Sequence, residues 1–139
     1  MFIHASFRFF SFFASVKLRI NYKKDPTMWI QIVAKLDEID KKYKLHIAGD
    51  FQDPRYGVYF DYIKREMNIE NNLILHGWVE NVDEFLKDKN YVLSTSIHES
   101  FGYNIAEGMA RGIKPIIHNY AGAKEQWPKE LIYNTIDEA

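Results

Sequence analysis

Short apolar runs alternate along this chain with longer segments whose apolar residues recur at helical spacing. The runs predict six strands, at residues 16–20, 44–48, 73–76, 91–94, 115–117 and 131–133. The segments between them predict five helices, near residues 26–39, 56–67, 82–86, 103–110 and 123–127. A strand joined to the next by a helix pairs in parallel with its neighbours, so we expect an α/β fold: a Rossmann-like parallel sheet with helices on both faces.

The composition limits the functions that such a domain can have. With 139 residues, the chain is long enough for one domain with its own core. The formal net charge is −1, and no excess of basic residues favours a nucleic-acid partner. The chain has no cysteine, which excludes disulfides and cysteine metal sites and is compatible with a reducing compartment. We therefore expect a cytoplasmic location, with peripheral association at the inner membrane face left open.

Residues 1–13 differ from the rest, because they hold six of the ten phenylalanines. A signal peptide begins with basic residues followed by an unbroken apolar run, whereas this segment begins without a basic residue and Arg8 interrupts its run. A buried strand, or the remnant of an interdomain segment, is the favoured interpretation over a membrane or export role. We expect an aromatic-rich segment at 1–13 and a single domain at 14–139.

The polar loop after the predicted strand 91–94 is the most informative segment. Ligands of open parallel sheets bind outside the carboxyl ends of the strands. This loop contains Gly102 and leads into a helix, whose free N–H groups and partial positive charge favour phosphate. Glu107 would lie about 7 Å further along that helix, within reach of a ribose, while Glu99 stays on the loop. The alternative is that the acidic and serine residues only cap the helix, and spacing alone does not decide between the two.

The segment from Glu99 to Glu107 resembles the Glu-x7-Glu signature of retaining GT-B glycosyltransferases, most closely the GT4-like glycosyl transferases group 1. Four further segments resemble motifs of the same family in the same order, at residues 19–24, 44–50, 75–79 and 115–125. Each of them lies at the end of a predicted strand. Together they extend the resemblance over residues 16–135.

The resemblance implies the nucleotide-sugar-binding, C-terminal half of a two-domain enzyme. Such a hexosyltransferase would move a sugar from a nucleoside-diphosphate sugar to a glycan or lipid acceptor, with retention at the anomeric carbon, in cell-envelope glycan synthesis. The resemblance implies no cofactor and no metal. We expect the acceptor-binding N-terminal domain to be absent from this chain. A truncated, non-catalytic nucleotide-sugar-binding domain is therefore the alternative.

The resemblance also assigns roles to single residues. Arg19 and Lys24 would neutralise the diphosphate leaving group, and Glu99 would bind hydroxyl groups of the transferred sugar. The donor-binding positions would be Gly49, Val79, Ser100, Phe101, Gly102 and Glu107. Among these, Glu107 would hold the ribose, Val79 would meet the base through its backbone, and residues 100–102 would offer N–H groups. The chain departs from the family pattern at Leu18 and Ala121, which stand where glycines are usual.

Two other enzyme classes fit the residues less well. A glycosidase would need Glu99 and Glu107 as paired carboxylates on either side of one bond, which a loop and a helix position do not favour. A dinucleotide fold would need a glycine-rich loop after its first strand, but the loop after Ile20 has no glycine. Asp37 and Asp40 are expected on a solvated acidic helix face rather than in a metal site.

Overall fold

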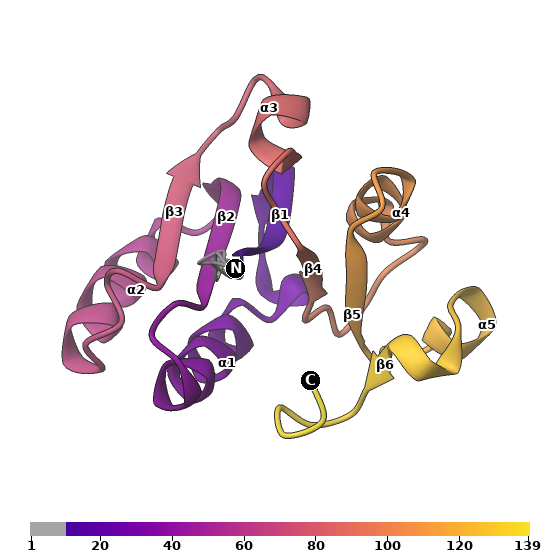
Figure 1. Cartoon of the computed structure of the whole chain (residues 1–139). Helices are drawn as coiled ribbons and strands as arrows, with labels where there is room; N and C mark the ends of the chain where they lie inside the picture. The colour runs from indigo at the N-terminus through magenta and orange to yellow at the C-terminus, as the bar shows by residue number, and fades with distance from the viewer. Residues whose placement is uncertain (1–10) are drawn as a thin grey trace, which may run out of the picture.

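The computed structural model describes residues 11–139, and the side chains of all of these except residues 13–18. The chain forms a six-stranded parallel sheet of order β3-β2-β1-β4-β5-β6 (Figure 1). The strands are β1 (Ser11–Ile20), β2 (Lys44–Phe51), β3 (Leu73–Gly77), β4 (Tyr91–Ser94), β5 (Lys114–His118) and β6 (Ile132–Tyr133). The helices are α1 (Pro26–Ile39), α2 (Pro54–Glu66), α3 (Val82–Leu86), α4 (Tyr103–Ala110) and α5 (Ala123–Gln126). Two short 3-10 turns are η1 (Tyr22–Lys24) and η2 (Lys129–Leu131). The expected α/β fold and element order are confirmed.

Two strands extend three or more residues beyond the bounds that the sequence predicts. β1 begins at Ser11 rather than at residue 16, because it lies at the centre of the sheet and pairs with β2 on one side and β4 on the other. The boundary expected between residues 13 and 14 therefore falls inside this strand, while residues 1–10 lie outside the described residues. β2 continues through Gly49 to Phe51, so that Gly49 is a strand residue and not the first residue of a loop.

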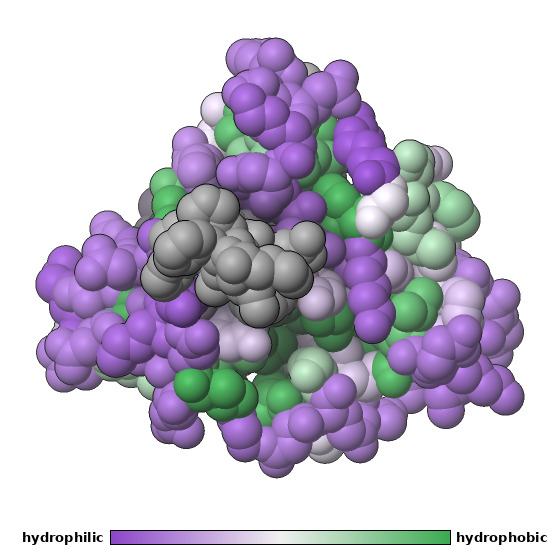
Figure 2. Space-filling view, in the orientation of Figure 1, coloured by the Kyte–Doolittle hydropathy of each residue, from purple (hydrophilic) through white to green (hydrophobic). Residues whose placement is uncertain are grey.

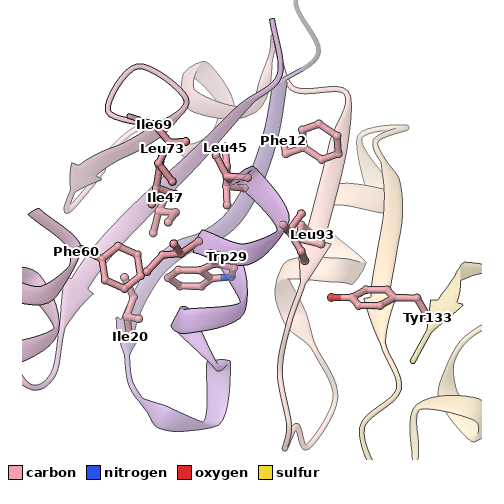
Figure 3. Close-up of a cluster of buried hydrophobic side chains, with 13 residues drawn as sticks. Phe12, Ile20, Trp29, Leu45, Ile47, Phe60, Ile69, Leu73, Leu93 and Tyr133 are labelled. Atoms are coloured by element: carbon pink, nitrogen blue, oxygen red, sulfur yellow. The ribbon is translucent and has the colours of Figure 1, made fainter. Parts of the chain in front are cut away.

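Alternating strand residues form two apolar layers, one on each face of the sheet. On one face, α1 and α2 cover residues such as Leu45 and Ile47, and Trp29 packs edge-on against Phe60 at a centroid distance of 6.2 Å (Figure 3). On the other face, α3 packs near Ala48, and α4 and α5 form a further cluster. This double-sided burial explains why the strand segments are short apolar runs.

Side-chain capping defines where two of the helices, α2 and α3, begin. Asp53 accepts a hydrogen bond from Arg55 N at 2.9 Å and precedes Pro54, so α2 begins two residues earlier than predicted. Asn81 caps α3 in the same way, through a 3.0 Å bond from the backbone of Glu84. Within residues 11–139, no helix is both long and apolar enough to cross a membrane.

An apolar cavity of about 290 Å³ lies at the amino end of the strands, away from the polar loops. Phe12, Leu36 and Tyr91 are among its lining residues, and the ion pair between Lys35 and Asp137 stands beside it. Figure 2 shows this side of the molecule as mostly hydrophilic, with a few apolar residues exposed around α1. The opposite edge of the sheet, where the strands have their carboxyl ends, carries the groups considered next.

Candidate functional site

The N-terminus of α4 is shaped by Gly102, which occupies the N-cap position with φ +83° and ψ +58°. Glycine has no side chain that could cap the helix, so no side-chain hydrogen bond closes this N-terminus, while the amide of Ile105 donates to the carbonyl of Gly102 at 3.0 Å. A Cβ atom at this position would lie 3.0 Å from Cδ1 of Ile105 and 3.5 Å from the Trp127 ring, so only glycine fits without strain. Glu99 and Ser100 do not cap α4, and the interpretation of these residues as simple caps is wrong.

Lys24 and Glu99 meet directly in front of this helix terminus. Their side chains form an ion pair between Lys24 Nζ and Glu99 Oε1, and both are largely buried, at 18% and 13% exposed. The hydroxyl of Ser96 donates to the same carboxylate oxygen at 2.7 Å. Lys24 follows β1 and Glu99 follows β4, so the pairing of these two strands brings their loops together.

Backbone bonds hold the two loops against each other. The amide of Ile97 donates to the carbonyl of Lys23 at 2.8 Å, and the Thr95 hydroxyl donates to the carbonyl of Lys24 at 2.5 Å. Thr95 and Ser96 are both buried. The position of Lys24 relative to the loop after β4 is thus set by direct hydrogen bonds.

Two residues on β5 and β6 bond to the end of β4 and to the loop that follows it. Nδ1 of His118 donates to the carbonyl of Ser96 at 2.9 Å, since a carbonyl can only accept. The hydroxyl of Tyr133 donates to the carbonyl of Ser94 at 3.0 Å. Burial raises the pKa of Tyr133 well above its usual value, so this phenol remains a donor at neutral pH.

Thr95, Ser96, His118 and Tyr133 are functional-site residues that were not predicted from the sequence. The only signal for them is the placement of hydroxyl and imidazole groups at the ends of apolar strands. The partners of Thr95, His118 and Tyr133 lie in segments distant in the chain, which the sequence does not identify.

Arg19 lies on the same edge of the sheet but in a separate pocket. It is exposed at the end of β1 and pairs in register with Asp50 of β2. These two residues, Phe51 and the half-exposed Trp78 line a pocket of about 370 Å³. The structure brings Lys24, Glu99 and Gly102 together around a small cavity, and it does not bring Arg19 into that group.

Glu107 lies on α4, away from the contact between Lys24 and Glu99. Its carboxylate is 3.5 Å from Nη1 of Arg111, and its side chain is 37% exposed. Arg111 also binds Asp83, which joins α4 to α3. Glu107 is therefore accessible to a ligand lying along the first two turns of α4.

The remaining predicted positions surround these groups. The carbonyl of Ser100 accepts a 3.0 Å bond from Gln126. Phe101 is 44% exposed, and its ring lies 5.7 Å from that of Trp127. Val79 is partly buried against the cluster around α3. Gly49 adopts φ +149° near the end of β2, in the region that favours glycine.

The acidic residues of α1 are not all solvated. Asp37 is only 14% exposed on its side chain and binds Lys41 at 2.9 Å, and its other oxygen is buried without a partner. The expectation of a fully exposed acidic face is wrong at this residue. Within the part of the chain that the structure describes, no group of three or more His, Asp or Glu side chains is placed to hold a metal.

Comparisons with known proteins identify the family of the chain. The family model of glycosyl transferases group 1 matches residues 11–130. The tRNA-queuosine alpha-mannosyltransferase of Drosophila melanogaster is 30% identical over 122 residues, which cover 84% of this chain and 31% of the relative. The chain thus spans about a third of the length of that curated relative.

Solved structures share the fold at low sequence identity. TarM, an S. aureus protein, superposes with a TM-score of 0.80 at 18% identity, covering 94% of this chain and 26% of TarM. HepE of Anabaena, in complex with UDP, gives 0.78 at 19%, covering 91% and 35%. The C-terminal domain of a glycosyl transferase group 1 protein from Francisella tularensis gives 0.69 at 16%, covering 87% and 61%. These likenesses and the family match lead to one conclusion: the chain belongs to the glycosyl transferases group 1, with the fold of GT-B glycosyltransferases.

Proposed function

We propose that this domain binds the nucleoside-diphosphate sugar of a retaining glycosyltransferase, which transfers the sugar to a glycan or lipid acceptor. The observation that carries the proposal is the uncapped N-terminus of α4 beside the ammonium group of Lys24. The positive end of the helix dipole and a neighbouring ammonium group together favour the binding of an anion. The UDP and UDP-glucose complexes of HepE and the UDP complex of TarM support a nucleotide ligand for this fold.

In this proposal the diphosphate lies between the first turn of α4 and Lys24. When the bond between the anomeric carbon and the diphosphate breaks, the electron pair stays on the diphosphate oxygen. The helix terminus and Lys24 stabilise the charge that develops there. The acceptor oxygen bonds to the anomeric carbon on the face from which the diphosphate leaves, and its proton passes to the departing diphosphate.

The other residues orient the donor around that point. Glu99 lies on the loop in front of α4 and accepts hydrogen bonds from sugar hydroxyls. Glu107 is accessible further along α4 and binds the ribose, while the backbone around Val79 meets the base. Arg19, in its neighbouring pocket, adds positive charge on the side of β1.

Titration calorimetry on this chain with UDP, GDP, UDP-glucose and GDP-mannose tests the donor site. We expect binding of one nucleotide family, and a loss of about tenfold in affinity in Glu107→Gln, which removes a charged hydrogen bond. Glu66→Gln, at the exposed end of α2, is the matched control and should retain the affinity. Absence of binding for both nucleotides, or equal affinity in both variants, would refute the site.

Two alternatives remain to be separated by an activity assay. A non-catalytic domain would bind the nucleotide sugar without transfer when an acceptor domain is supplied. The Drosophila relative, whose name gives an alpha-mannosyltransferase of tRNA queuosine, supports a second acceptor class, a nucleoside hydroxyl in tRNA. Transfer of labelled sugar to tRNA, but not to glycans or lipids, would select that class.

A further inference from the structure

One oxygen of Glu99 holds two donors at once. Oε1 pairs with the ammonium group of Lys24 and accepts the hydroxyl of Ser96 at 2.7 Å. The residue proposed for sugar binding is therefore bound to the residue proposed for the diphosphate. The ion pair occupies one oxygen of Glu99 and partly neutralises the charge of Lys24.

The two donors differ in how firmly they are held. Ser96 is 3% exposed, its side chain is short, and its carbonyl is held by His118. The backbone of Lys24 is held by Thr95, but its ammonium group stands at the end of a flexible four-carbon chain. Lys24 Nζ can therefore change partner by rotation of a long side chain, whereas the hydroxyl of Ser96, one bond from its Cβ atom and buried, can move only a short way.

The alternative partner of Lys24, a diphosphate at the first turn of α4, would lie close to it. Lys24, Glu99 and the N-cap residue Gly102 line the same small cavity. A diphosphate at the first turn of α4 carries more negative charge than a single carboxylate and is the stronger partner for a lysine ammonium.

From this arrangement we propose that Lys24 exchanges Glu99 for the diphosphate when the donor binds, and that Ser96 is the positioning residue that then holds Glu99 towards the sugar. The inference rests on the proposed function, since it requires a nucleoside diphosphate at α4. When a nucleoside diphosphate without a sugar binds, Glu99 competes with it for Lys24. When the complete nucleotide sugar binds, Glu99 instead binds the sugar. Sugar recognition is thereby coupled to diphosphate binding.

A double-mutant cycle measured with UDP and GDP tests the exchange. Glu99→Gln removes the competing charge, so we expect it to bind the nucleoside diphosphate about fivefold more tightly than the unmodified chain. The same variant should bind the matching nucleotide sugar more weakly. Lys24→Met should weaken nucleoside-diphosphate binding, and adding Glu99→Gln to Lys24→Met should then have no effect, because the competition acts only through Lys24.

Ser96 is tested by comparing two substitutions. Ser96→Ala should lower affinity for UDP-glucose or GDP-mannose about fivefold while leaving affinity for the matching nucleoside diphosphate unchanged. Ser96→Thr keeps the hydroxyl and should restore most of the difference. If Ser96 only supported the loop, Ser96→Ala would weaken the binding of both ligands equally. Thermal melting checks that each variant is folded.

The outcomes separate the two proposals. If the unmodified chain binds neither UDP nor GDP, the donor site and the exchange both fail. If it binds one of them but Glu99→Gln does not bind it more tightly, or still does so in the Lys24→Met background, the donor site stands and the exchange is overturned.

Discussion

Acidification should destabilise this domain through His46, on β2. Its Nδ1 lies 2.8 Å from Nε2 of His76 on β3, and its ring packs edge-on against Phe85 beneath α3. Burial is the largest cause that lowers the pKa of His46 to about 4, followed by the positive charge of Lys89. The carboxylate of Asp88 acts in the opposite direction but does not cancel these effects.

The sign follows from the difference between folded and unfolded states. An unfolded histidine has a pKa of about 6.5, so between pH 6.5 and pH 4 the unfolded chain binds more protons at His46 than the folded chain does. The contribution of His46 is complete above pH 6.5 and is lost as the pH falls towards 4. Between pH 7 and pH 5 the full shift corresponds to about 2 kcal/mol. For a ring that is only partly buried, we expect about 1 kcal/mol.

Urea unfolding at pH 7 and pH 5, followed by tryptophan fluorescence, measures this loss. His46→Gln keeps a polar partner for His76 but does not titrate, so its free energy of unfolding should fall by about 1 kcal/mol less than that of the unmodified chain. His98→Gln, which replaces an exposed histidine and retains His46, should lose as much as the unmodified chain. Equal losses in His46→Gln and the unmodified chain would refute the reasoning.

Three further substitutions test the packing. Gly102→Ala places a Cβ atom on a left-handed backbone with a carbon atom 3.0 Å away. It should lower the melting temperature more than Gly112→Ala, where the backbone has φ +75° but the space around it is open and the cost is about 1 kcal/mol. Phe60→Ala, at a fully buried position, should cost about 3–5 kcal/mol in urea unfolding, against about 0.5 kcal/mol or less for the exposed Val58→Ala. Tyr133→Phe should cost about 1–3 kcal/mol, because it leaves a β4 carbonyl buried without its donor. A cost for Val58→Ala equal to that of Phe60→Ala, or no cost for Tyr133→Phe, would contradict the respective arguments.

The strands and helices follow from local patterns, with β1 as the main exception. Runs such as residues 91–94 and 115–117 are apolar because both of their faces are covered, and the strands β4 and β5 occupy these places. The aromatic-rich start of the chain has no such clear boundary between a strand and a loop. Its pairing with β2 and β4, rather than its own sequence, extends β1 back to Ser11.

The candidate site, too, could be predicted only in part from the sequence. The motif positions Glu99, Gly102 and Glu107 could be placed at a strand end and along the following helix from the sequence alone, because they lie within nine residues of one another. The residues that other strands contribute to the site could not be placed in this way. Arg19 belongs to the same short motif as Lys24, yet its side chain lines the neighbouring pocket beside Asp50.

The sequence by itself determined the order of the elements and the loop that carries Glu99 and Gly102, because hydrophobic period, glycine and helix start are local properties. Only the tertiary structure decided that Lys24, 75 positions away from Glu99, is its partner and that Ser96 shares the same oxygen. That pairing depends on β1 and β4 being neighbours, although two other strands separate them in the chain. Strand neighbourhood is set by the packing of the whole sheet, which no segment of the sequence specifies alone.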